Sequence, residues 1–378
     1  DNGQKTDGED MKTMKKWMAS LLALSVLAGL TMTGCGEKKE AGNEGSSQQK
    51  HIESICYVTA NLGDKSMSDI ANEGLVKAGK EFGLTYKTIE YGTDKAKIEP
   101  SILDAAENYD LVFLSGSERL EYVQKHAAEF PDVKFVAFDV DPSKVPEHPN
   151  VYCITYAQNE GDFLAAALAQ KMSSNGVIGW VGGREDTVIN DFLVGYIEGS
   201  KHASPTGKVA ISFVGDFSNA PKAKELALLQ IEQSGANIIH QVAGGAGLGV
   251  FEALSTKEGT WGIGVDADQR NFFIESKPEI ADLILVSMQK RNDVAIYDLT
   301  KMTMNGETEM YGTNETWGIA RGAIGLSEND FYKQNTPQEV QDYITQCKEG
   351  ITGGSIKVKS AFGLEQEVIN TMKNEVKA

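Results

Sequence analysis

The strongest constraint on the fold is an alternation of short apolar runs with longer amphipathic runs along most of the chain. Short β-branched runs predict strands, and the longer segment Met67–Phe82 places its apolar residues on one helical face. Strands that alternate with helices form parallel sheets with right-handed crossovers. Ten strands are predicted, at Ser54–Thr59, Leu84–Glu90, Asp110–Leu114, Val133–Asp139, Val151–Thr155, Val177–Val181, Lys208–Val214, Asn237–Val242, Trp261–Val265 and Leu283–Val286.

The last five predicted strands repeat the first five at a nearly constant distance. They begin 123, 124, 127, 128 and 132 residues after their counterparts. A near-constant offset indicates two copies of one βα unit, and 378 residues are enough for two hydrophobic cores. We therefore predict an α/β fold with two doubly wound parallel-sheet lobes joined by a hinge.

The lobe boundaries follow from this pattern. We expect residues 51–156 and 288–310 to form lobe 1, and residues 157–287 and 311–330 to form lobe 2. Residues 331–378 are predicted to be a C-terminal helix and tail packed on the lobes. The sequence Thr336-Pro337-Gln338-Glu339 is typical of a helix start, with an N-cap, a first-turn proline and a reciprocal glutamate.

Residues 1–34 are predicted to be a leader and a lipoprotein signal peptide. A basic stretch from Met11 precedes the uncharged run Trp17–Met32, whose sixteen residues are short for a membrane-spanning helix. The sequence Met32-Thr33-Gly34-Cys35 resembles a bacterial lipobox, in which Cys35 would be lipidated. An uncleaved anchor with an incidental cysteine is the alternative.

Residues 35–50 contain no large apolar side chain and are predicted to be a flexible tether after the lipidated cysteine. We therefore expect an extracytoplasmic protein that is lipid-anchored to the cell membrane.

The composition limits which partners, disulfides and metal sites we expect. The net charge of −18 argues against nucleic acid as a partner, because a phosphate backbone would repel this surface. We expect buried thiols at Cys56 and Cys153, which lie within predicted strands; Cys347 makes a third cysteine, so the three cannot all pair. No zinc motif is present, and we expect no metal, no cofactor and a monomer.

Polar residues at the strand ends of lobe 1 are candidate ligand contacts, because ligands bind outside the carboxyl ends of strands in open α/β sheets. The residues are Asp64, Ser66, Met67, Ser68, Asp69, Ser115 and Asp139. Ser66 or Ser68 could cap the helix that follows, leaving N–H groups for an oxygen-rich ligand. The alternatives are capping without a ligand, a simple turn at Ser115, and a turn cap at Asp139 before Pro142.

The matching positions of lobe 2 are Phe217, Gly244, Asp266 and Lys290. Phe217 could stack on a planar ring or merely cover the sheet edge. Gly244 lies in a glycine-rich run whose spacing does not fit a dinucleotide fingerprint, although a ligand could approach its backbone closely. Asp266 could accept two hydroxyl hydrogen bonds, and Lys290 could bridge Asp266 to a ligand or be a surface lysine.

Residues from about Ser54 to Leu326 resemble the basic membrane lipoproteins, which are bacterial ABC-transporter solute receptors that include purine-nucleoside receptors. The matching stretches occur in the family's order. They are Asp64-Lys65-Ser66 with Asp69, Glu73-Gly74-Leu75, Pro131-Asp132-Val133-Lys134-Phe135, Gly179-Trp180-Val181-Gly182-Gly183, Ala243-Gly244-Gly245-Ala246-Gly247-Leu248-Gly249-Val250, Gly264-Val265-Asp266-Ala267-Asp268-Gln269 and Ser287-Met288-Gln289-Lys290-Arg291.

The resemblance implies a two-lobed periplasmic-binding-protein fold of type I and a membrane permease as partner. In nucleoside receptors of this family, two aromatic rings enclose the base and an Asn and an Asp read its polar atoms, while an Asp and a Lys hold the ribose. The corresponding residues here are Phe217 for one ring, Asp139 for the base-reading carboxylate, and Asp266 and Lys290 for the ribose.

The chain departs from the family pattern in its first loop. The usual Asp-Lys-Ser-Phe-Asn becomes Asp64-Lys65-Ser66-Met67-Ser68, which loses one aromatic ring and the base-reading amide. A thioether can still cover a ring face. We therefore expect a nucleoside, most simply a purine nucleoside, with a modified nucleoside, another ribosyl compound or a sugar as alternatives.

Two other functions compete with a transport receptor. A hydrolase could use Asp266 and Asp268, but no histidine lies in a candidate loop and no hydrolase motif occurs. A signalling lipoprotein of the same fold would bind its ligand without feeding a transporter. We expect a receptor and not an enzyme.

Overall fold

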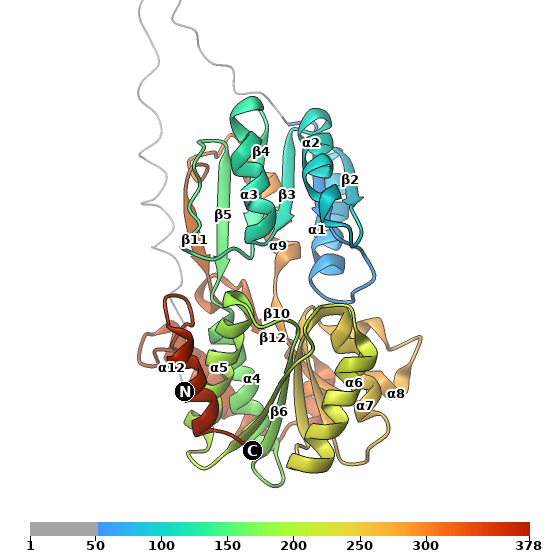
Figure 1. Ribbon diagram of the computed structural model, residues 1–378, viewed down its shortest axis with the longest axis vertical. Helices are drawn as coiled ribbons and strands as arrows, with labels where there is room; N and C mark the ends of the chain where they lie inside the picture. The colour runs from blue at the N-terminus through green and yellow to red at the C-terminus, as the bar shows by residue number, and fades with distance from the viewer. Residues whose placement is uncertain (1–51) are drawn as a thin grey trace, which may run out of the picture. The chain divides into compact units, whose positions relative to one another are not determined.

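The computed structural model describes residues 52–378, which form two six-stranded sheets (Figure 1). The first sheet has the strand order β11-β5-β4-β3-β1-β2 and the second has the order β12-β10-β9-β8-β6-β7. All neighbouring strands are parallel except β10 and β12. The predicted pair of doubly wound α/β lobes is confirmed.

Lobe 1 is built around the first sheet. Its strands are β1 (Ser54–Thr59), β2 (Thr85–Glu90), β3 (Leu111–Ser115), β4 (Lys134–Phe138), β5 (Val151–Tyr156) and β11 (Asn314–Trp317). Its helices are α1 (Met67–Phe82), η1 (Lys95–Lys97), α2 (Ile98–Asn108), α3 (Ser117–His126), η2 (Ala127–Glu129) and α9 (Asn292–Met304). Helix α1 has the predicted bounds and packs against α9.

Lobe 2 is built around the second sheet. Its strands are β6 (Val177–Gly182), β7 (Lys208–Phe213), β8 (Ile238–Val242), β9 (Trp261–Asp266), β10 (Ile284–Lys290) and β12 (Ile324–Leu326). Its helices are α4 (Gln158–Met172), α5 (Thr187–Ala203), α6 (Ala220–Leu229), the π-helical turn η3 (Gln230–Ser234), η4 (Gly244–Gly247), α7 (Leu248–Leu254), η5 (Gln269–Phe272), α8 (Pro278–Ala281) and η6 (Ile319–Arg321). Each of the ten predicted strands is present.

Within residues 52–378 the chain passes between the lobes three times, and two of the predicted boundaries differ from the structure. We expected lobe 1 to resume at residue 288, but β10 stays in the second sheet through Lys290, because it pairs with both β9 and β12. The prediction that residues 311–330 belong to lobe 2 is wrong for Asn314–Trp317, which pair with β5 in lobe 1. Strands β11 and β12 therefore add one edge to each sheet.

The C-terminal region forms three helices, α10 (Asp330–Asn335), α11 (Gln338–Thr352) and α12 (Gln366–Glu375). The expected N-cap at Thr336 is wrong: α11 begins after Pro337 without a side-chain cap, and the Thr336 hydroxyl has no hydrogen-bond partner. The segment before α12 is held on lobe 2 by Asp191, whose carboxylate accepts hydrogen bonds from Ser360 Oγ at 2.6 Å and Ala361 N at 2.8 Å.

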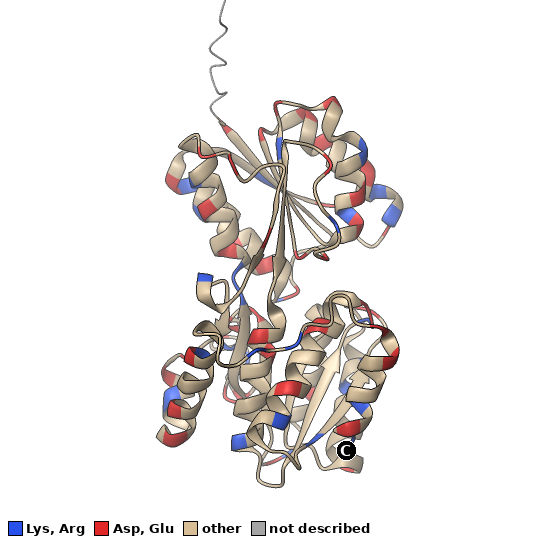
Figure 2. Cartoon of the chain, turned by 90° about the vertical axis from the view of Figure 1, so that its left-hand side faces the viewer, with Lys and Arg blue, Asp and Glu red and all other residues tan. Residues whose placement is uncertain are grey.

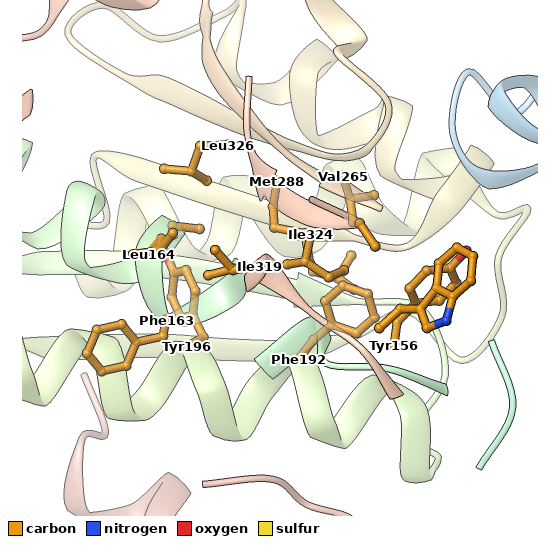
Figure 3. Close-up of a cluster of buried hydrophobic side chains, with 14 of the residues drawn as sticks. Tyr156, Phe163, Leu164, Phe192, Tyr196, Val265, Met288, Ile319, Ile324 and Leu326 are labelled. Carbon is orange, nitrogen blue, oxygen red and sulfur yellow. The ribbon is translucent and has the colours of Figure 1, made fainter. Parts of the chain in front are cut away.

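The hydrophobic core continues from one lobe into the other. Figure 3 shows Tyr156, at the end of β5, beside Phe192 of α5 and Ile324 of β12. Glycines at positions 195 and 199 bring α5 so close to α4 that a side chain at either position would meet α4 backbone. In contrast, Asp and Glu lie mainly on the helices and loops around both sheets (Figure 2). A continuous apolar core with closely packed helices thus lies between the two sheets.

Candidate functional site

Two aspartates occupy equivalent strand ends in the two lobes. Asp139 follows β4 and Asp266 ends β9, and both have left-handed backbone, with φ of 61° and 65°. Among residues 52–378, Lys65 is the other non-glycine residue with positive φ. Such a conformation disfavours L-residues other than Asn and Asp, so it marks backbone that the surroundings hold in place. The duplicated unit thus presents one carboxylate from each lobe.

Lys290 joins these two carboxylates across the lobes. Its ammonium donates a hydrogen bond to Asp139 Oδ1 at 2.7 Å and lies 3.9 Å from Asp266 Oδ1. The side chain is 2% exposed, and its Nζ lies 4.8 Å from the ring centroid of Phe192 and 5.5 Å from that of Tyr156. Burial acts to lower the pKa of Lys290, but Asp139 and Asp266 raise it above its ordinary value. The lysine is therefore a buried cation and not a surface lysine.

Asp266 has a second partner from lobe 1. Ser66 Oγ donates a hydrogen bond to Asp266 Oδ2 at 2.5 Å, and both residues are buried. Burial raises the pKa of Asp266 to about 6, although Lys290 and the Ser66 hydroxyl act to lower it. The neighbouring Asp268 instead accepts hydrogen bonds from Asn271 and Asn329.

The loop before α1 is organised by its own carboxylates. Asp64 accepts hydrogen bonds from the backbone N–H groups of Ser66 and Ser68 at 2.9 Å and of Asp69 at 3.2 Å. Asp69 accepts from Gly63 N at 2.7 Å and Lys65 N at 2.8 Å. The expectation that Ser66 or Ser68 caps α1 and leaves these N–H groups for a ligand is therefore wrong, because Asp64 occupies them.

The remaining lobe 1 candidates lie at different depths. Ser68 is buried, and its hydroxyl lies 3.1 Å from Thr59 Oγ1 at the end of β1. Ser115 is fully buried at the end of β3, and its hydroxyl has no hydrogen-bond partner. Met67 is partly exposed in the first turn of α1. Met67 is therefore the accessible one of these three side chains, whereas the Ser115 hydroxyl is enclosed by the protein.

Phe217 lies on the glycine-rich turns of lobe 2 with 39% of its surface exposed. Its ring covers Gly183 so closely that a Cβ there would overlap it, and Arg184 lies 5.7 Å from the ring centroid. Gly244, with φ of 53°, lies beside Phe217, while Gly245 approaches the backbone of Asp64 in lobe 1. The aromatic ring and the glycine turn therefore lie next to the first loop of lobe 1.

Gln269 and Lys65 also connect the lobes, although the sequence analysis does not predict them as site residues. Gln269 is fully buried, and its Nε2 donates a hydrogen bond to the Lys65 carbonyl oxygen at 2.7 Å. Tyr156 and Phe192, which lie beside Lys290, are not among the predicted site residues either. Gln269 and Lys65 both fall inside the sequence stretches that carry the family resemblance, which was the available signal.

The cysteines give no sign of chemistry at this site. Cys56, Cys153 and Cys347 are buried free thiols, as predicted for the first two, and burial raises the pKa of Cys56 and of Cys153 to about 12. Cys35 lies outside the described residues. Residues 52–378 contain no cluster of three metal-binding side chains, and none of their helices is long and apolar enough to cross a membrane.

Known proteins resemble this chain along nearly its whole length. The sequence model of a family described as ABC transporter substrate-binding protein PnrA-like matches residues 53–359. The ABC transporter nucleoside-binding protein BmpA of Lactococcus lactis is 29% identical over 360 residues, covering 92% of this chain and 100% of that protein. The CD4+ T-cell-stimulating antigen of Listeria innocua is 28% identical over 368 residues, covering 91% and 98%.

The fold also matches a solved structure. An ABC transporter solute-binding protein from Aeropyrum pernix superposes with a TM-score of 0.74 at 21% identity, covering 85% of this chain and 97% of that one.

Proposed function

Because the chain belongs to the family of PnrA-like ABC transporter substrate-binding proteins, as its motifs predicted, we propose that it captures a nucleoside, most simply a purine nucleoside, between its lobes. The observation that carries this proposal is the set Asp139, Lys290 and Asp266, in which one buried cation faces a carboxylate from each lobe. The family is a substrate-binding component of a transporter and not an enzyme.

The ribose is proposed to bind at Asp266 and Lys290. Asp266 Oδ2 already accepts from Ser66, while Oδ1 lies beyond hydrogen-bonding distance of Lys290 Nζ at 3.9 Å. Oδ1 can therefore accept a ligand hydroxyl, and Lys290 can donate to the same oxygen of the ligand. Vicinal hydroxyls match this alternation of acceptor and donor.

The base is proposed to stack on Phe217 and to be read by Asp139. The exposed part of the Phe217 ring supplies an apolar face beside the Gly244 backbone. Met67 would cover the opposite face, and Ser115 would offer its unpartnered hydroxyl. Asp64 and Asp69 are left out of the contact set, because their oxygens hold the first loop together. Ser68 would contribute to the site indirectly, through the hydrogen bond between its hydroxyl and Thr59 Oγ1.

Delivery and anchoring complete the proposal. We infer that a membrane permease receives the solute, and that a lipid such as palmitate on Cys35 holds the protein at the outer face of the cell membrane after its signal peptide is removed. Residues 36–50 would serve as the tether. The lipobox-like sequence before Cys35 supports the anchor, and the family supports the transporter.

A sugar ligand is favoured by one specific observation. Met67 and Ser68 stand where the family has Phe and Asn, so the base side is weakened while Asp266 and Lys290 are kept. A signalling lipoprotein that binds the same solute without feeding a transporter is the other alternative.

A thermal-shift panel tests the proposal on protein that has been unfolded and refolded to remove bound solutes. Adenosine, guanosine, inosine, cytidine, uridine, free bases, ribose and hexoses are compared, since tight binding raises the midpoint by mass action. A purine nucleoside should give the largest shift, whereas a response to ribose or hexoses alone would contradict the nucleoside. Deletion of the gene should reduce uptake of the radiolabelled hit, and unchanged uptake would favour signalling.

A further inference from the structure

Lobe 2 holds two consecutive residues of lobe 1 at three points. Gln269 Nε2 donates to the Lys65 carbonyl oxygen at 2.7 Å, and Ser66 Oγ donates to Asp266 Oδ2 at 2.5 Å. The Lys65 ammonium lies 5.4 Å from the ring centroid of Phe272 and 5.5 Å from that of Phe273, within the range of a cation–π contact. The contacts use a backbone oxygen, a hydroxyl and a side-chain cation.

The lobe 1 side of this contact is held by hydrogen bonds within its own loop. Lys65 has left-handed backbone, with φ of 51°, and its N–H is fixed by the Asp69 carboxylate. Ser66 N is fixed by Asp64, which also holds the first turn of α1. The unfavourable conformation of Lys65 is thus maintained from both sides, and it presents its carbonyl oxygen to lobe 2.

The lobe 2 side is equally fixed, through Gln269. Its Oε1 accepts from Gln241 Nε2 at 2.5 Å and from Val265 N at 3.0 Å, while its own backbone N–H donates to Ser287 Oγ at 3.1 Å. These bonds orient the amide so that Nε2 faces Lys65. Because Gln269 is 0% exposed, loss of its partner would leave a buried donor without a hydrogen bond.

We propose that Lys65 and Ser66 form an interlobe latch, that Gln269 is its positioning residue, and that the latch keeps the lobes closed around the solute. This inference deepens the proposed function, on which it rests. The latch bonds lie outside the Asp139–Lys290 pair, and one of them fixes Asp266 in position for the ligand. Asp266 therefore takes part both in closure of the lobes and in the proposed ligand contact. The latch determines the rate at which the solute dissociates.

The distance between the lobes tests the latch without any ligand. Spin labels are placed at the exposed positions Glu107 of lobe 1 and Glu258 of lobe 2 as Glu107→Cys and Glu258→Cys, in full-length protein that also carries Cys35→Ser. The three remaining thiols are buried and are not labelled. The electron–electron distance distribution is then recorded for the parent, for Gln269→Glu, and for Lys65→Met combined with Ser66→Ala.

Gln269→Glu keeps the acceptor for Gln241 and Val265 but turns an oxygen toward the Lys65 carbonyl, so it should lengthen the interlobe distance. The lobe 1 double variant should do the same, and it decides the matter if Gln269→Glu does not fold. Gln233→Glu adds the same charge at an exposed lobe 2 position and is the matched control. Unchanged distributions in the folded latch variants would overturn the proposal.

Solute release gives the second readout. Dissociation of inosine, measured by stopped flow, should be on the order of tenfold faster in the latch variants, with a smaller change in association. Equal dissociation rates in parent and variants would overturn the latch. If the parent protein binds no nucleoside, the proposed function fails, while the ligand-free distance measurement still decides whether the latch exists.

Discussion

The ends of β4 and β9 carry the same residue in the same backbone conformation, but the two carboxylates have different surroundings. Asp139 receives a 2.7 Å hydrogen bond from Lys290, whereas Asp266 lies 3.9 Å from that ammonium and instead accepts from Ser66. Asp139 is 14% exposed and Asp266 is 10% exposed at the side chain. The two acids occupy equivalent strand ends, and they differ because Lys290 from β10 donates its hydrogen bond to Asp139.

This difference determines how each carboxylate contributes to stability. Asp139 holds the buried cation, so it contributes to the connection between the lobes. Asp266 is a buried carboxylate whose raised pKa shows that ionisation costs free energy in the folded protein. An unfavourable buried charge, as at Asp266, is typical of a functional site, where it is kept at a cost in stability.

The largest expected effect comes from removing the shared cation. Lys290→Met leaves Asp139 and Asp266 facing each other without a counter-charge, and loss of one partner of a buried ion pair costs about 3–5 kcal/mol. Urea denaturation at pH 7 should show that loss relative to the parent. Lys301→Met, at an exposed position, is the control and should change the free energy of unfolding by less than about 0.5 kcal/mol. A Lys290→Met protein as stable as the parent would contradict the assigned pairing.

The two aspartates should respond to the same substitution with opposite signs. Asp139→Asn removes the charge bonded to Lys290 and should lower the free energy of unfolding by about 1–3 kcal/mol. Asp266→Asn keeps an acceptor for Ser66 and removes a costly charge, so it should raise that free energy by up to about 3 kcal/mol at pH 7. Asp132→Asn, on the surface, serves as the control. Equal changes in the free energy of unfolding at both positions would contradict the proposed difference between Asp139 and Asp266.

The pH dependence sharpens the same contrast. The pKa of Asp266 rises from 3.8 to about 6 on folding, so the folded protein binds a proton more tightly than the unfolded chain. Its contribution to stability is therefore present below about pH 4 and is lost as the pH rises through about 6. The advantage of Asp266→Asn over the parent should shrink from pH 7 to pH 4, as measured by urea denaturation at several pH values. A constant difference would place the pKa of Asp266 elsewhere.

A smaller effect is expected on the base side. Met67→Phe places an aromatic ring in the first turn of α1 and should tighten purine-nucleoside binding by about 1 kcal/mol, with little change for ribose. Calorimetric titration measures both ligands. Val368→Phe adds a ring to exposed α12 and should change neither affinity. If Met67→Phe weakens nucleoside binding instead, Met67 does not face the base.

Local sequence signals predicted the parts of the fold that local forces determine. The ten predicted strands and helix α1 follow from runs of β-branched residues and from helical periodicity. Strands β11 and β12 were missed because each has only three or four residues, and β11 is polar, reading Asn314-Glu315-Thr316-Trp317. Their pairing depends on partners far away in sequence, and a local sequence pattern contains no information about those partners.

The candidate site was predictable as a set of strand ends but not as a set of contacts. The topology rule placed Asp139, Asp266 and Lys290 at the ends of strands from two lobes. Which carboxylate takes the ammonium depends on side-chain packing, which sequence spacing does not encode. The same is true of Asp64, which replaced the serines as the cap of α1, and of Gln269, whose role depends on a bond across 204 positions.

The proposed nucleoside site is tested by a calorimetric titration of ligand-stripped protein with inosine, carried out on the parent and on Asp266→Ala. Saturable one-to-one binding by the parent is expected. Asp266→Ala should weaken it by several kcal/mol, because buried ligand hydroxyls lose their acceptor. Unchanged affinity in a folded Asp266→Ala protein, or no binding of inosine or any other nucleoside by the folded parent, would contradict the proposal that this interlobe site holds a nucleoside.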